Sequence, residues 1–284
     1  MQADQGNIEL TLLGTGCPSV DLDRLGPANL VDGGPSSRLL IDCGSGVTHR
    51  LLEAGCPGSQ LDALLITHLH SDHIVDLFQL IISSWHQGRK YPQRIFGPPG
   101  TKKFVDGLMK LWAPELTQRV AHEKRPSAAA LETEVTEISD GDTLNFKHIT
   151  VKVVEVNHLP VRHAFGFIFE TSNARLAISG DTTYCPALIK AAKNVDMLVH
   201  EVLIHRELPI IDGVRSAETV TAMQAYHTVS NQVGKVASEA GAGKLVLTHF
   251  VPPKFDYKSL LDEVQQDFSG PIIIGEDLMK LSVS

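Results

Sequence analysis

The sequence predicts an α/β protein, because short apolar runs typical of strands alternate with amphipathic patterns typical of helices along most of the chain. Its 284 residues are 43% hydrophobic and 20% charged, which is ordinary for a globular protein with a sizeable core. The formal charge of −8 is spread through the chain without long blocks of one sign. These observations exclude a disordered chain and a collagen-like repeat.

Apolar runs rich in β-branched residues predict the strands. In chain order they lie at 8–16, 37–44, 61–67, 149–157, 164–170, 174–180, 195–200, 244–248 and 271–275. Helical patterns predict helices at 74–87, 101–112, 186–194, 229–241 and 259–268. Two helix boundaries are marked locally: Thr101 follows the turn "GPPG", and Gly241 ends the run that opens at Ser230.

A turn-rich polar passage over residues 123–142 divides the chain. The part before it is led by strand patterns, and the part after it is similar. We therefore expect a single domain over residues 1–284, in two pseudo-equivalent halves at about 1–125 and 145–284.

Several classes of protein and partner are disfavoured. The apolar runs fall far short of the ~18 residues that a membrane-spanning helix needs, so we expect a soluble protein. The N-terminus has no apolar signal core, which favours the cytoplasm, or a periplasmic or secreted location if a signal peptide has been removed. The acidic charge makes nucleic acid an improbable partner. Scattered cysteines without a C-x-x-C pair predict small buried side chains and no disulfides: Cys17, Cys43, Cys56 and Cys185.

The stretch "THLHSDH" at residues 67–73 follows a predicted strand and concentrates side chains that bind metals. In an extended segment His68 and His70 point the same way, and a turn into the next helix swings Asp72 and His73 toward the same space. Neutral imidazoles and carboxylates suit zinc or a similar divalent ion. An isolated histidine is more often a solvated surface residue, but this concentration predicts a metal site.

Further ligand-type residues stand just after other predicted strands. His158, Asp181 and His249 each follow such a run, as do His200 and Glu201. Open α/β sheets build their sites at the carboxyl ends of strands, so these side chains are expected to converge. Two ligand sets result, with Asp181 as the bridge: His68, His70, His158 and Asp181 for one ion, and Asp72, His73, Asp181 and His249 for the other.

Other candidates have weaker support. His163 lies five residues beyond His158 and is a candidate substrate contact, a partner of a ligand, or the third histidine ligand itself, although we favour His158. Trp85 and Arg89 in "WHQGR" are candidates to line the substrate pocket, or they form an exposed helix end. Asp42 is a candidate to orient a ligating histidine, although a buried turn-capping aspartate would give the same pattern.

The motif "THLHSDH" matches the H-x-H-x-D-H signature of the metallo-β-lactamase superfamily, and the later "NHLP", "SGDT" and "THF" resemble its remaining ligand motifs. The segments "LLGTGCPS", "LLIDCGSG" and "GEDLMKL" resemble the branch that contains ribonuclease Z and arylsulfatase-like hydrolases. The resemblance implies a four-layer αβ/βα sandwich with a dinuclear zinc site at one edge, between the two sheets. It also suggests a homodimer.

Two segments carry the assignment to this branch. "HEVL" at 200–203 and "HTVS" at 227–230 resemble the ribonuclease Z pair in which a glutamate orients a histidine that protonates the leaving group. The resemblance implies that Glu201 and His227 act in catalysis together with Asp72. A histidine held by a carboxylate is a good proton donor near neutral pH. A surface histidine in a polar loop remains the alternative for His227.

The expected reaction is hydrolysis. Two metal ions about 3.5–4 Å apart would hold a bridging hydroxide that serves as the nucleophile. Zinc is the expected metal, with iron and manganese as alternatives, because histidine and carboxylate ligands accept all three.

The substrate is expected to be a small-molecule ester. Ribonuclease Z proteins carry a Gly- and Pro-rich arm that grips tRNA, inserted after the segment that corresponds to "AFGFIFE"; here only "TSNA" separates that segment from "RLAISGD". The missing arm and the acidic charge favour a small phosphodiester or an aryl sulfate ester. The alternatives are a lactonase or β-lactamase-like amide hydrolase, and the tRNA 3′-end endoribonuclease despite the missing arm.

Overall fold

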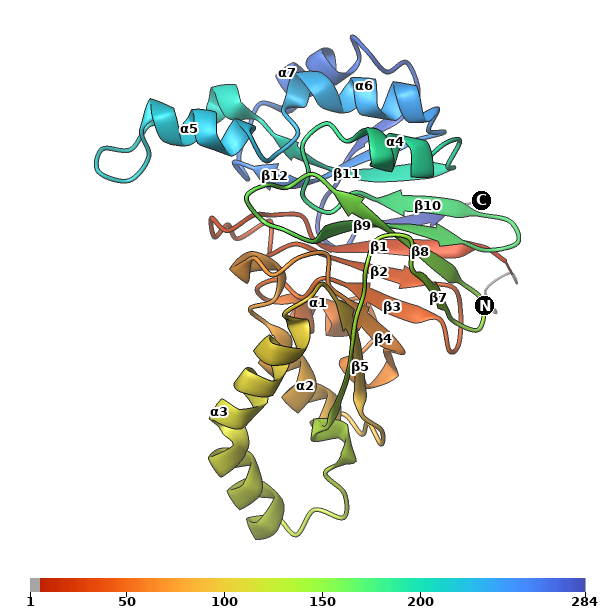
Figure 1. Cartoon of the computed structure of the whole chain (residues 1–284), viewed down its shortest axis with the longest axis vertical. Coiled ribbons are helices and arrows are strands. Elements are labelled where there is room, and N and C mark those ends of the chain that lie inside the picture. Colours follow the sequence, from red (N-terminus) through yellow and green to blue (C-terminus); the bar gives the residue numbers. More distant parts are fainter. Residues whose placement is uncertain (1–5, 284) are drawn as a thin grey trace.

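The computed structural model describes residues 6–283, which form two β-sheets lying face to face with helices on both outer surfaces (Figure 1). Within these residues each sheet has seven strands. The first runs in the order β14 (Lys280–Val283), β1 (Ile8–Gly14), β2 (Ala28–Asp32), β3 (Arg38–Ile41), β4 (Ala63–Leu65), β5 (Gln93–Gly97) and β6 (Thr133–Glu137). The second runs in the order β13 (Ile272–Ile274), β12 (Leu245–Val251), β11 (Met197–Leu203), β10 (Arg175–Ile178), β9 (Ala164–Glu170), β8 (Thr150–Val156) and β7 (Thr143–Asn145).

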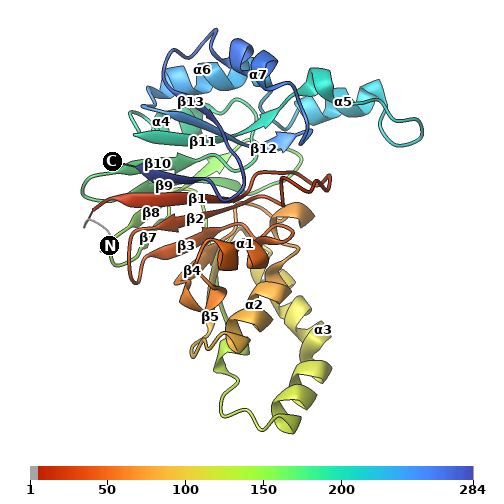
Figure 2. The same cartoon turned by 180° about the vertical axis from the view of Figure 1, so that it is seen from behind.

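Helices complete the four layers of the sandwich that the family resemblance implied (Figures 1 and 2). The first sheet packs against α1 (Val47–Glu53), α2 (Leu77–His86) and α3 (Thr101–His122). The second packs against α4 (Pro186–Ala191), α6 (Ser230–Ala240) and α7 (Tyr257–Val264). The remaining helix, α5 (Ala217–Gln224), projects from the end of the second sheet beside these layers.

Every strand and helix predicted from the sequence is present, with ends that differ by a few residues, except that α3 continues through Pro114 to His122. The prediction missed β2, β5, β6, β7 and β14, together with α1 and α5. Several of these lie at sheet edges, where one side of the strand is solvated and the apolar signal is weak. The strand β6, "TEVTE", is the clearest example, because none of its residues is buried.

The polar passage 123–142 does not simply divide the chain, as the sequence had suggested. It contains β6, which pairs in parallel with β5 and so belongs to the first sheet. The C-terminal strand β14 also returns to this sheet and pairs with β1. Because both ends of the chain contribute to one sheet, we infer that residues 6–283 form one domain.

No helix within residues 6–283 is both long enough and apolar enough to cross a membrane. The four cysteines are free and buried, as the sequence predicted.

The core between the sheets contains a row of phenylalanines from β9, and Phe167 lies at its centre with no exposed surface. Its cross-strand neighbours are Val153 on β8 and Ile178 on β10. We expect Phe167→Ala to lower the free energy of unfolding by about 3–5 kcal/mol, because truncation leaves a cavity that the two packed sheets cannot close. Urea denaturation measures the effect. Leu22→Ala, at a side chain 91% exposed, is the control and should change stability by no more than ~0.5 kcal/mol; equal effects would contradict this packing.

Candidate metal centre

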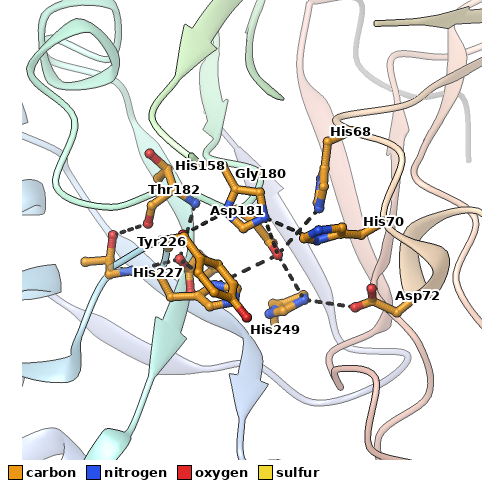
Figure 3. Close-up of polar contacts among 12 residues, drawn as sticks. His68, His70, Asp72, His158, Gly180, Asp181, Thr182, Tyr226, His227 and His249 are labelled. Carbon is orange, nitrogen blue, oxygen red and sulfur yellow. Dashed lines mark hydrogen bonds and ion pairs between the residues drawn. The ribbon is translucent and has the colours of Figure 1, made fainter. Parts of the chain in front are cut away.

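The predicted ligands come from both sheets and meet between the strand ends (Figure 3). His68 and the short helical turn η2 (Ser71–His73) follow β4 of the first sheet. His158 and Asp181 follow β8 and β10 of the second sheet, and His249 lies in β12. The site therefore forms only when the two sheets pack against each other.

A break in strand register turns His249 toward the site. Along β11 and β12, Glu201 lies opposite Thr248, but Val202 lies opposite Phe250, so His249 is an extra residue in β12. Its backbone is in the left-handed region, with φ of 46°. In a regular strand His249 would lie on the same face as Leu245 and Leu247, which pack against the helices. Because of the extra residue, Phe250 lies on that face instead. The bulge thus turns the His249 side chain toward the site. The sequence predicts the position of His249 along the strand but not this change of direction.

Asp181 reaches the centre because the chain turns sharply at Gly180, where φ is 59°. A Cβ atom at this position would lie 2.5 Å from the carbonyl oxygen of Phe165, so only glycine fits. The Asp181 side chain is almost fully buried.

The first predicted ligand set is a compact group of His68, His70, His158 and Asp181, whose candidate ligand atoms all lie within 4.8 Å of one another. His158 Nε2 lies 3.3 Å from His70 Nδ1 and 3.9 Å from Asp181 Oδ2. His68 Nε2 lies 3.7 Å from the same carboxylate oxygen.

The second group lies on the other side of Asp181. Asp72, His73 and His249 also lie within 4.8 Å of one another. His249 Nε2 is 3.3 Å from both His73 Nε2 and Asp72 Oδ2. Asp181 Oδ2 is 3.5 Å from the Nε2 atoms of His73 and His249, so this single oxygen faces both groups.

These separations fit a bound divalent cation. Ligand atoms held ~2.0–2.1 Å from a tetrahedral zinc ion lie about 3.3–3.4 Å from one another. The two nitrogen–nitrogen contacts of 3.3 Å, His158–His70 and His73–His249, have this separation. Moreover, His68 Nε2 is buried without a hydrogen-bond partner, which is costly unless another group such as a cation occupies the space beside it.

Hydrogen bonds on the far side of the rings point nitrogen lone pairs inward. His158 Nδ1 lies 2.7 Å from the carbonyl oxygen of Tyr226, which can only accept, so the proton is on Nδ1 and Nε2 is free to bind. His73 Nδ1 donates in the same way to Asp42 at 2.8 Å. The Thr67 hydroxyl donates to Asp42 and accepts from His68 Nδ1 at 3.0 Å. Such outer partners are typical of ligating histidines.

The charges of the centre also favour a cation. Burial lowers the pKa of His68 and of His158, so both rings are mainly neutral at pH 7. Burial opposes protonation of His73 too, but the carboxylates of Asp181 and Asp42 outweigh it and hold its pKa well above the usual value. The same carboxylates attract a metal cation, and its binding would displace the His73 proton.

Asp42 links the hydrogen bonds that orient the rings of His73 and His68. Its carboxylate accepts from His73 Nδ1, from the Thr67 backbone N–H at 2.8 Å and from the Thr67 hydroxyl. We expect Asp42→Ala to weaken metal affinity by ~10–100-fold, because His73 and Thr67 lose the acceptor that orients them. Titration against a competing chelator measures this. Asp106→Ala, on the exposed face of α3, is the matched control; equal metal affinity in both variants would show that Asp42 only caps a turn.

Glu201 and His227 form a buried pair beside Asp181. Glu201 Oε1 lies 3.2 Å from His227 Nδ1 and accepts from the backbone N–H of Thr228 at 2.8 Å. Burial by itself lowers the pKa of His227, but the Glu201 and Asp181 carboxylates outweigh it and raise the pKa to about 9. The raised pKa favours the doubly protonated ring at neutral pH, with Nδ1 directed at Glu201.

Tyr226 is a site residue that sequence reasoning missed. Besides fixing His158 through its carbonyl, its ring packs against His227 with centroids 4.6 Å apart and against His158 at 5.2 Å. Its only sequence signal is its position next to His227, since a half-buried tyrosine before a polar loop is otherwise unremarkable.

Of the three candidates for substrate contact, Trp85 and Arg89 are buried and His163 is exposed. The Trp85 indole N–H donates to the carbonyl of Ser127, and the buried Arg89 guanidinium donates to the carbonyls of Leu61, Tyr91 and Pro92. These hydrogen bonds hold the C-terminal end of α2 against its neighbouring segments. His163 is exposed, lies 3.6 Å from Glu155 and belongs to neither ligand group, whereas the favoured His158 does.

Comparison with known proteins assigns the family. The family described as anti-Pycsar protein Apyc1 matches residues 8–211. The chain is 35% identical to ribonuclease Z of Mycobacterium marinum, over 97% of this chain and 99% of that protein. It is 36% identical to ribonuclease Z of Mycolicibacterium gilvum, over 97% and 96%.

Solved structures show the same fold. The metallo-β-lactamase fold protein YhfI from Bacillus subtilis matches with a TM-score of 0.75 and 21% identity, over 97% of this chain and 99% of that one. The short form of human tRNase Z matches with a TM-score of 0.68 and 22% identity, over 97% and 99%. This chain is thus a hydrolase of the metallo-β-lactamase superfamily, in the ribonuclease Z branch, and belongs to the family described as anti-Pycsar protein Apyc1.

Proposed function

We propose that this protein is a zinc-dependent hydrolase that cleaves a small phosphodiester or aryl sulfate ester, with His227 as the proton donor to the leaving group. The observation that carries the proposal is the juxtaposition of two ligand groups around Asp181 with a buried histidine, His227, held by Glu201. A hydrolase whose leaving group departs as a strongly basic oxygen, such as an alkoxide, needs such a donor.

In this proposal His68, His70, His158 and Asp181 hold one divalent ion, and Asp72, His73, Asp181 and His249 hold the other. When bound, the two ions would lower the pKa of a coordinated water and neutralise charge on the electrophile's oxygens. Zinc suits this nitrogen and carboxylate donor set, and iron and manganese are the alternatives.

The residues of the chain supply orientation and the proton. Asp42 and Thr67 hold the rings of His73 and His68, while the Tyr226 carbonyl holds that of His158. His227 Nδ1 stays directed at Glu201, so Nε2 is the atom that gives its proton to the leaving oxygen. Glu201 stabilises the protonated ring and fixes its orientation, as a positioning carboxylate does for a catalytic histidine.

A small substrate is supported by the connection between β9 and β10. Only residues 171–174 join these strands, and the Thr171 hydroxyl accepts from the backbone N–H of Ala174 within the turn. Such a tight turn leaves no room for the tRNA-gripping arm that would be inserted here. The formal charge of −8 points the same way.

Ribonuclease Z activity is the second candidate. It is favoured by the 35% identity to proteins named ribonuclease Z, which extends over nearly the whole of both chains. The predicted homodimer fits either function and is tested by sedimentation of the purified protein.

A substrate panel separates these functions. Zinc-loaded protein is assayed with bis(4-nitrophenyl) phosphate, 4-nitrophenyl sulfate, a lactone, a β-lactam and a precursor tRNA, with chelator-treated protein as the control. We expect metal-dependent turnover of the diester or the sulfate. Cleavage of the precursor tRNA alone would select ribonuclease Z, and turnover of only the lactone or the β-lactam would select the lactonase or amide hydrolase alternative.

A further inference from the structure

We infer that a cavity beside Asp72 binds the ester substituent that remains on the phosphoryl group after cleavage, and that this substituent is neutral and about the size of one ring. The inference rests on the proposed function and narrows its substrate class to phosphodiesters. An aryl sulfate has no second ester substituent, so such a cavity is useful only to a diesterase.

The cavity lies between the loop that follows β1 and the turn that carries Asp72. It has a volume of about 240 Å³. Its apolar wall includes Pro18, Val20, Leu25 and Val75, and the hydroxyl-bearing residues Ser45 and Ser71 also line it. Ligand pockets usually measure about 300–1,000 Å³, so this space suits one ring rather than an extended molecule.

The β1 loop is fixed in place, so the cavity is preformed. The Arg24 guanidinium stacks on Phe250, 4.3 Å from the ring centroid, and donates to the Thr15 hydroxyl, the Gly275 carbonyl and the Tyr257 hydroxyl. These bonds tie the loop to the second sheet and to the C-terminal segment. A preformed pocket binds without the cost of ordering a loop.

The charges around the cavity select a neutral group. Its charged lining residues are Asp21, Asp72 and Arg24. The Arg24 guanidinium is buried, and its N–H groups already donate to Thr15, Gly275 and Tyr257. Lys254 forms an ion pair with Asp21 but does not line the cavity. Because Asp21 pairs with Lys254 and Asp72 is assigned to a metal ion, the lining offers an anionic substituent no side-chain cation that is free to bind it, which disfavours a second phosphate at this end of the site.

The position of the cavity identifies which substituent it receives. In Figure 3, Asp72 and His227 stand at opposite ends of the cluster, with Asp181 and His249 between them. His227 also lies near Asp181 and His249 but not in the group with Asp72. The leaving oxygen must be close to His227 to take its proton, so the cavity at the Asp72 end is left for the substituent that stays.

The test uses 4-nitrophenyl diesters that share one leaving group and differ in the other substituent. We expect zinc-loaded protein to prefer phenyl over methyl by ~10-fold or more in kcat/KM, since an apolar pocket discriminates at this level. Val75→Trp should fill the cavity and abolish most of that preference. Val214→Trp, at an exposed valine in the segment before α5, is the control and should keep it.

A substrate with a charged substituent tests whether the cavity prefers a neutral group. A 4-carboxyphenyl substituent should be cleaved more slowly than phenyl, and Asp21→Asn should recover part of the difference. Asparagine keeps the oxygen that accepts from the Asp23 backbone N–H, so the loop is preserved.

Binding of the products provides a readout that needs no turnover. Phenyl phosphate should bind to the zinc-loaded protein more tightly than methyl phosphate, and Val75→Trp should remove the difference in calorimetry. Equal binding of the two, or unchanged phenyl preference in an active Val75→Trp variant, would overturn the cavity assignment. Absence of both diester and sulfate hydrolysis by protein that holds two zinc ions would instead refute the proposed function, while the binding comparison would still test the cavity.

Discussion

Asp181→Ala is expected to reduce bound metal below two equivalents and to lower kcat/KM by more than the ~10–100-fold that loss of an outer-shell partner causes. Oδ2 of this residue lies 3.5 Å from His73 and His249 and 3.7 Å from His68, so its removal affects both ligand groups. Burial alone raises the pKa of Asp181, but the imidazoles of His249 and His73 outweigh it and hold the pKa well below its usual value. The residue is thus an anion between two groups of nitrogen donors, and alanine removes that charge.

Elemental analysis of dialysed protein and steady-state kinetics on the same sample measure this outcome. Asp212→Ala is the matched control, because Asp212 is an exposed aspartate in the segment before α5 and contacts no residue of the centre. Circular dichroism checks that both variants fold. Two tightly bound ions together with wild-type activity in Asp181→Ala would contradict the bridging role.

Much of the centre could be predicted because strand ends are legible in a sequence. His68, His158 and Asp181 each follow a strand of largely apolar, mostly buried residues, and the carboxyl ends of parallel strands in an open sheet lie at one edge. The placement of His158 and Asp181 at one edge of the second sheet follows from these strand ends, whereas His68 joins them through the packing of the first sheet on the second. The same apolar runs predicted the central strands, which are buried on both faces and carry the strongest signal.

What the sequence could not show depends on contacts between distant segments. The bulge that turns His249 inward arises from a register shift against β11, and no residue type marks it. Asp42 accepts a hydrogen bond from Thr67, which lies 25 residues further along the chain. The sequence does not indicate which residue such an aspartate contacts. Likewise, Trp85 and Arg89 have the composition of a binding surface, but backbone carbonyls from distant segments accept their hydrogen bonds.

His227→Ala should have an effect that depends on the leaving group. For a diester with an alkyl leaving group we expect a fall in kcat of ~10²–10⁴-fold, the usual contribution of a positioned acid. For a 4-nitrophenyl ester the fall should be much smaller, because a weakly basic phenolate departs without a proton. The reason lies in the pair itself: Glu201 holds Nδ1 at 3.2 Å, and the carboxylates that raise the pKa of His227 to about 9 keep the proton available at neutral pH.

The decisive measurement is the slope of log kcat against the basicity of the leaving group across a series of aryl and alkyl diesters. Removal of the acid should steepen this slope, whereas loss of a purely structural residue would lower all rates by a similar factor. Glu201→Gln should produce a weaker version of the same steepening, because the amide no longer stabilises a charged ring. His122→Ala, at the exposed end of α3, should leave the slope and the rates unchanged. If His227→Ala slows every ester equally while metal content is retained, the histidine positions the substrate and does not donate the proton.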